Sequence, residues 1–168
     1  MPELKLLFDP VTLPEASQAE KAEIGIERLV DRYKNDNGQS PFIETLIADS
    51  GGRRLLDSIF GNSGFLGQCI LQDPAFLQEL LAKGPDAAFQ EVLLSLEPYR
   101  TADEGQDQIM SVLRVARRRV ALLTAIADIT AVWPLHRVAG SLSKFADTAT
   151  SVATAHLLRG AASQGALT

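Results

Sequence analysis

The sequence predicts an all-α protein, an irregular helical bundle in which short capped helices precede two long amphipathic helices. Through residues 108–159, apolar side chains recur at alternating steps of three and four, which places them along one side of a helix. Upstream, proline and glycine turn signals divide the chain into short segments, and none shows the period-two alternation of a β-strand. We therefore expect helices without a sheet.

Composition limits the classes of function. The chain has 168 residues, which fits one domain, and a net charge of −5, which argues against a general electrostatic grip on nucleic acid. No apolar run approaches the ~20 residues needed to cross a bilayer, and the N-terminus lacks the basic start of a secretory signal. We expect a soluble, cytoplasmic protein that binds neither nucleic acid nor membrane. The single cysteine, Cys69, is expected to be a small buried hydrophobe.

The N-terminal third predicts an arm and a first helix. Residues 1–14 contain three prolines, which favour an extended N-terminal arm over a helix. Residues 15–34 are rich in helix-forming residues with an apolar edge, and the Asn-Gly pair that follows is a turn signal. We place the helical domain at residues 15–160.

Short helices joined by tight turns fill residues 40–97. A capping side chain followed by proline marks two helix starts, at Ser40-Pro41 and at Asp73-Pro74. Gly51-Gly52 is expected to interrupt the chain before the next helix. The other short helices are expected over residues 53–60, 63–71 and 86–96.

Two long helices form the second half. Trp133-Pro134 separates them, and the chain ends in a small-residue stretch, residues 161–168, which we interpret as a linker to a missing domain. The apolar stripe of the first comprises Ile109, Leu113, Ala116, Val120, Leu123 and Ala127. The stripe of the second comprises Leu135, Val138, Leu142, Phe145, Ala149, Ala153, His156 and Leu157.

Arginines cluster on the first long helix. Helical register places Arg114 and Arg118 opposite its apolar stripe, with Arg117 and Arg119 on the two flanks. One interpretation is a solvated face whose aliphatic stems cover the core. The other is a set of guanidinium groups that pairs with carboxylates of an adjacent helix or domain, or with a nucleotide phosphate. The cluster alone does not distinguish the two.

Two carboxylates, Asp128 and Asp147, lie one on each long helix. Such a pair could bind a metal or act in acid–base catalysis, but we favour interhelical ion pairs with Arg117 or Lys144. The chain has two histidines, and neither has the spacing of a zinc site. We predict no metal site and no catalytic residue within this sequence.

Several blocks of the sequence resemble the N-terminal part of glutamine synthetase adenylyltransferase, the bifunctional adenylylating and deadenylylating enzyme of bacterial nitrogen control. Together they cover about residues 50–160. The blocks are Ser63 to Leu81 with Asp73-Pro74, Leu113-Arg114 with Arg117-Arg118-Arg119, Ala127-Asp128-Ile129, and Leu142-Ser143 with Ala146-Asp147.

The resemblance implies a parent with two nucleotidyltransferase domains that use ATP, phosphate and Mg²⁺. One domain would remove AMP from a tyrosine of glutamine synthetase by phosphorolysis, and the other would attach it. The Gly-rich, Ser-Asp-x-Asp signature of these domains is absent here, so no catalytic residue is carried over and the chain alone is expected to be inactive.

What carries over is a supporting role for helices. The resemblance implies packing against the deadenylylating domain, with Arg114, Arg117, Arg118, Asp128 and Asp147 as candidate domain-packing or supporting residues. It also implies glutamine synthetase and the PII signal protein as partners. The alternative is a free-standing helical adaptor that binds a partner helix and has no enzymatic activity.

Overall fold

The computed structural model describes residues 9–165, so residues 1–8 of the predicted arm and the end of the predicted linker lie outside the described residues. Within that range the secondary structure is helical and contains no strand, which confirms the all-α prediction. The α-helices are α1 Ala19–Tyr33, α2 Ser40–Ala48, α3 Ser50–Asn62, α4 Gly64–Gln72, α5 Pro74–Lys83, α6 Pro85–Leu96, α7 Gln106–Ile129 and α8 Leu135–Ser163. Two short 3₁₀ helices, η1 Pro10–Thr12 and η2 Glu97–Arg100, complete the description.

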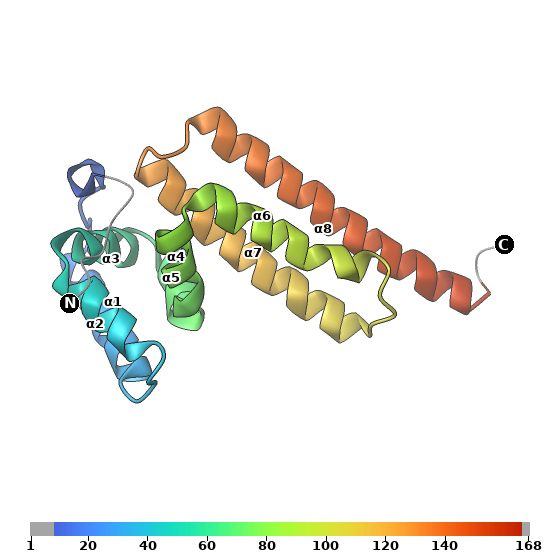
Figure 1. Ribbon diagram of the computed structural model, residues 1–168, viewed down its shortest axis with the longest axis horizontal. Coiled ribbons are helices and arrows are strands. Elements are labelled where there is room, and N and C mark those ends of the chain that lie inside the picture. Colours follow the sequence, from blue (N-terminus) through green and yellow to red (C-terminus); the bar gives the residue numbers. More distant parts are fainter. Residues whose placement is uncertain (1–8, 166–168) are drawn as a thin grey trace.

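The helices divide into a short-helix end and a long-helix end (Figure 1). Helices α1, α2 and α3 gather at the N-terminal end, and α4 and α5 connect them to the remainder. Helices α6, α7 and α8 lie side by side, with α7 and α8 running in opposite directions after the turn at residues 130–134. Helix α8 extends furthest and brings the described C-terminal end away from the short helices.

Of the two predicted starts with a capping side chain and a proline, Ser40-Pro41 differs, because α2 begins at Ser40 itself and the Ser40 hydroxyl donates to Glu44 at 2.9 Å rather than capping the helix. The start at Asp73-Pro74 is confirmed. The side chain of Asp73 accepts a hydrogen bond from the backbone N–H of Phe76 at 3.2 Å, and Pro74 occupies the first turn of α5. Ser63 caps α4 in the same way, through the N–H of Leu66. Because each cap satisfies an N–H that the helix itself leaves unpaired, consecutive helices can meet at a single residue.

One continuous apolar core joins the two ends of the molecule. Leu29 of α1, Leu56 of α3 and Leu123 of α7 are each fully buried within it. Cys69 is buried, as predicted, with 3% of its surface exposed. Burial raises the pKa of its thiol, and this effect is larger than the lowering caused by the positive charges of Arg118 and Arg117. None of the helices within residues 9–165 combines the length and the apolar character that spanning a membrane requires.

Three predicted boundaries differ from the structure. Gly51 and Gly52 do not interrupt the chain, because α3 already begins at Ser50 and both glycines are buried in its first turn. Helix α8 continues to Ser163, so the first residues of the predicted linker are helical. The described part of the arm contains η1 and lies against α3, where the guanidinium of Arg54 donates to the carbonyl of Leu13 at 3.1 Å.

Candidate functional site

The five residues predicted to pack against another domain do not form one cluster. Arg114 and Arg117 are exposed on α7, and Arg118 is half-buried near Cys69 of α4. Asp128 is exposed near the end of α7, and Asp147 is exposed on α8. Helical register places Arg114, Arg117 and Asp128 on one side of α7, but Arg117 and Asp128 are eleven positions apart, or roughly 16 Å along the axis.

The predicted interhelical ion pairs of Asp128 and Asp147 do not form. Among residues 9–165, neither carboxylate lies within 4.0 Å of a cationic side chain. The prediction was wrong because the two side chains point to solvent from helices whose contact is made on other faces. The ion pairs that the two long helices make with other helices use aspartates at the starts of α5 and α6 instead.

The first of these ion pairs joins α7 to α5. Arg119 Nε donates to Asp73 Oδ2 at 2.7 Å, and the guanidinium lies 5.1 Å from the ring centre of Phe76. Asp73 therefore does two things, since its other oxygen caps α5. The sequence analysis identified both features separately, as a cap and as a flanking arginine, but it did not pair them.

We expect Asp73→Ala to lower the free energy of unfolding by about 1–2 kcal/mol, because it removes the cap of α5 and leaves Arg119 without its carboxylate. Asp73→Asn is the matched control. Asparagine caps helices as well as aspartate does, and a partly exposed ion pair contributes at most about 1 kcal/mol. The free energy of unfolding should therefore fall less in Asp73→Asn than in Asp73→Ala. Urea denaturation followed by circular dichroism measures both. Equal losses in the two variants would contradict the capping role.

The second ion pair lies at the turn between α7 and α8. Asp86, in the first turn of α6, accepts from Trp133 Nε1 at 3.2 Å and from Arg137 Nη2 at 2.7 Å. The Trp133 ring is buried, packs edge-on against Phe89 with ring centres 6.0 Å apart, and lies 5.1 Å from the Arg137 guanidinium. This group of contacts fixes the start of α8 on α6. The sequence analysis treated Trp133-Pro134 only as a helix break.

A third contact holds the far end of α8. The Arg159 guanidinium donates to the backbone carbonyls of Arg100 and Tyr99, the last two residues of η2. A cation at the carbonyl end of a helical turn also complements its dipole. Helix α8 is thus held near both ends, which defines the face that it presents to the rest of the chain.

That face differs from the stripe predicted for α8. Val138 is buried against the core, as predicted, and so is Val152, which the predicted stripe did not include. Leu135, Leu142 and Leu157 of the predicted stripe are instead 76%, 44% and 66% exposed. The three leucines lie roughly a quarter turn around the axis from the two valines. We call these three leucines, which lie along one side of the helix, the exposed apolar flank of α8. The described residues do not cover it.

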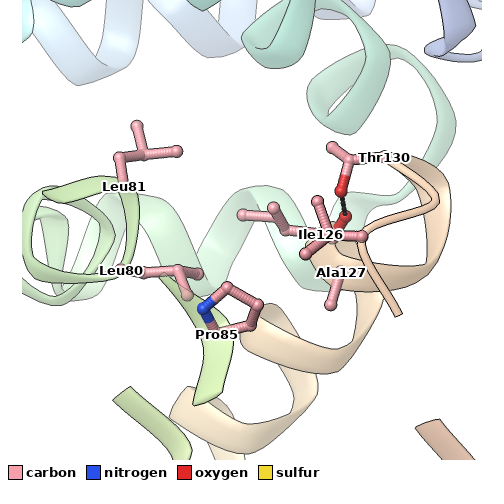
Figure 2. Close-up of a pocket in the computed structure, with 7 residues that line it drawn as sticks. Leu80, Leu81, Pro85, Ile126, Ala127 and Thr130 are labelled. Carbon is pink, nitrogen blue, oxygen red and sulfur yellow. Dashed lines mark hydrogen bonds between the residues drawn. The ribbon is translucent and has the colours of Figure 1, made fainter. Parts of the chain in front are cut away.

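A small, partly enclosed pocket lies between α5 and α7 (Figure 2). Leu80, Leu81, Pro85 and Ile126 give it an apolar lining, and its volume is about 20 Å³, which is room for a single water molecule. The one hydroxyl on its wall, that of Thr130, already donates to the Ile126 carbonyl at 2.6 Å. The pocket is therefore a packing gap and offers no binding chemistry.

Metal-ligating side chains do not gather anywhere in the described part of the chain. Residues 9–165 contain no group of three or more histidine, cysteine, aspartate or glutamate side chains placed to hold a metal ion.

The sequence comparisons identify the family. A family model described as glutamate-ammonia ligase adenylyltransferase matches residues 53–168. The chain belongs to this family. The bifunctional glutamine synthetase adenylyltransferase/adenylyl-removing enzyme of Bradyrhizobium diazoefficiens is 33% identical over 129 residues, covering 77% of this chain and 13% of the relative. The protein of the same name from Rhizobium meliloti is 32% identical over 166 residues, covering 94% of this chain and 16% of the relative.

The chain thus spans a small part of these adenylyltransferases, with 11% coverage of the Caulobacter vibrioides relative, which is 33% identical over 113 residues. No solved structure shows a significant match. The matched range begins within α3 and includes α4 to α8, the helices that carry the ion pairs of Asp73 and Asp86. The family resemblance predicted from the sequence is confirmed.

Proposed function

We propose that this chain is the N-terminal helical portion of a bifunctional glutamine synthetase adenylyltransferase, and that its helices support the domain that removes AMP from glutamine synthetase by phosphorolysis. The observation that carries this proposal is the family match over residues 53–168 in a chain that spans 11% to 16% of the relatives described above. The whole enzyme would also attach AMP from ATP, act in the cytoplasm, and respond to the PII signal protein.

We assign the Mg²⁺ and ATP of the proposed parent reaction to other parts of the parent enzyme, because the Gly-rich, Ser-Asp-x-Asp signature that would hold them does not occur in this sequence. The contribution of this chain is to hold and contact the other domains. Helices α6 to α8, which the contacts of Asp86 and Arg159 hold together, present Arg117 and the exposed apolar flank of α8 to the remaining domains.

Two features support a role in contact with other parts of a protein. Arg114 and Arg117 have no ion-pair partner within 4.0 Å among residues 9–165, and both lie inside the family match. The exposed apolar flank of α8 also lies inside it. The adaptor alternative predicts the same surfaces without the enzymatic context, and no observation favours it specifically.

The test uses the full-length enzyme. We expect Arg117→Ala to lower the rate of phosphorolytic AMP removal from adenylylated glutamine synthetase by about tenfold, the loss that follows when one charge-assisted contact worth about 1.4 kcal/mol no longer positions the active domain. The 168-residue chain carrying the same substitution should unfold at an unchanged temperature, because Arg117 is exposed there.

Lys34→Ala is the control, because Lys34 is an exposed cation at the end of α1, outside the matched range. It should leave AMP removal unchanged. Wild-type activity in the Arg117→Ala enzyme would reject the supporting role of this arginine. A full-length parent unable to transfer AMP to or from glutamine synthetase would reject the proposed function itself.

A further inference from the structure

A polar groove lies between α6 and α8, on a different part of α8 from its exposed apolar flank. Phe89 and Gln90 of α6 form one wall, and its volume is about 280 Å³. This is near the lower end of the range for small-molecule sites, so the groove has room for a small metabolite or ion. The other wall is made by five residues of α8, namely His136, Arg137, Gly140, Ser141 and Lys144.

Ser141 is the first unusual feature of this groove. Its side chain is 3% exposed, and its hydroxyl has no hydrogen-bond partner among the described residues. A helical hydroxyl usually bonds to the carbonyl four positions earlier, as Thr148 of the same helix does to Lys144 at 2.9 Å. A buried polar group left unpaired is costly, so Ser141 calls for an explanation beyond the fold.

Gly140 is the second unusual feature of this groove. It lies in the interior of α8, where glycine is less favourable than alanine by about 1 kcal/mol. No atom lies within 4 Å of the position that a β-carbon would occupy, so neither close packing nor a positive φ requires glycine there. Glycine leaves the helix backbone accessible from the groove, as it does at sites where a ligand approaches the backbone closely.

The third unusual feature is the positive charge on the α8 wall of the groove. Arg137 is neutralised by Asp86 at 2.7 Å, whereas Lys144 and His136 have no carboxylate within 4.0 Å among residues 9–165. The groove thus offers hydrogen-bond donors from an ammonium, an imidazole, the amide of Gln90 and the unpaired hydroxyl of Ser141. An ammonium with neighbouring neutral donors is suited to a phosphate group.

We propose that the α6–α8 groove is a binding site for a phosphoryl group, either free phosphate or the phosphate of a small metabolite. Lys144 supplies the charge, and His136 and Gln90 donate from the two sides. Ser141 lines the groove and donates its unpaired hydroxyl, and Gly140 leaves room for the ligand against the helix. The inference is independent of the proposed function, since it concerns residues other than those assigned to domain contact.

The experiment is a ¹H–¹⁵N NMR titration of the 168-residue chain with inorganic phosphate, sodium chloride keeping the ionic strength constant. We expect saturable shifts of the backbone amides at residues 136–144. Lys144→Gln should weaken binding at least fivefold, and Gly140→Ala at least threefold because its methyl group enters the space left for the ligand. Acetate should bind at least threefold more weakly than phosphate.

Gly160→Ala is the matched control for Gly140→Ala, because Gly160 lies on the same helix, outside the groove, with the same open space around it. It should leave the affinity unchanged. Shifts that do not saturate, an unchanged affinity in Lys144→Gln, or acetate binding as tightly as phosphate would each overturn the proposal. Circular dichroism confirms that every variant is folded before its affinity is compared.

Discussion

Substituting alanine for Gly52 should destabilise the protein by about 3 kcal/mol, near the upper end of the range for overpacked cores. A β-carbon at this position would lie 2.3 Å from the backbone carbonyl oxygen of Leu46 and 2.7 Å from its Cδ1. The leucine side chain could rotate, but the carbonyl belongs to α2 and cannot move without shifting that helix. The N–H of Gly52 is also held by Asp49 at 2.8 Å, which resists displacement of α3.

Thermal and urea unfolding of Gly52→Ala and Gly160→Ala measure this effect against a matched control. Gly160 lies in α8 with no atom within 4 Å of its added β-carbon, so alanine there should stabilise the protein, by up to about 1 kcal/mol, through helix propensity alone. The pair separates steric conflict from propensity, since both substitutions replace a helical glycine with the same residue. A loss of less than about 1 kcal/mol in Gly52→Ala would show that α2 and α3 are not in close contact.

The Gly51-Gly52 pair shows where local sequence signals fail. Glycine disfavours helix, so the pair was interpreted as an interruption, yet both residues lie in the first turn of α3. Tertiary packing decides the outcome, because only a residue without a side chain lets α3 begin against the end of α2. One local signal was available. Asp49 stands three residues before Gly52, the spacing of a helix N-cap.

The long helices show which parts of an amphipathic pattern can be predicted. The stripe of α7 was predicted correctly, because one apolar face dominates and Ile109, Val120 and Leu123 are buried on it. Helix α8 has apolar residues over a wider arc, and spacing alone could not tell that Val152 faces the core whereas Leu157 does not. That choice depends on where the rest of the chain docks.

Ion pairs were the least predictable feature of the candidate site. Asp128 and Asp147 were selected because they lie on the long helices, but the carboxylates that pair with arginines of the long helices, Asp73 and Asp86, lie in short helices or at their starts. Partners separated by 46 and 51 residues depend on the three-dimensional arrangement of α5, α6, α7 and α8, which no local pattern contains. The sequence analysis identified the arginine cluster of α7. Its member that forms an ion pair, Arg119, was not among the candidate domain-packing residues.

Trp133→Ala should lower the free energy of unfolding by about 3–5 kcal/mol, the range for removing a buried aromatic side chain. The ring is 4% exposed, packs edge-on against Phe89, and donates to the carboxylate that also binds Arg137. Its loss leaves a cavity at the point where α6, α7 and the start of α8 meet. We expect circular dichroism to show a lower urea midpoint, with α8 losing helicity first because its N-terminal attachment depends on this ring.

Trp133→Phe separates packing from hydrogen bonding at the same position. Phenylalanine keeps an aromatic ring against Phe89 but removes the indole donor and some packing area, and Asp86 still accepts from Arg137. The free energy of unfolding should therefore fall by about 1 kcal/mol. Because Trp133 is the only tryptophan, its fluorescence in the wild-type chain reports directly on this junction. A fluorescence transition that precedes the loss of helical signal would show that the junction opens first and α8 is released as a unit. Coincident transitions in the wild type, with a loss in Trp133→Ala no greater than in Trp133→Phe, would contradict the role of this ring as the attachment point of α8.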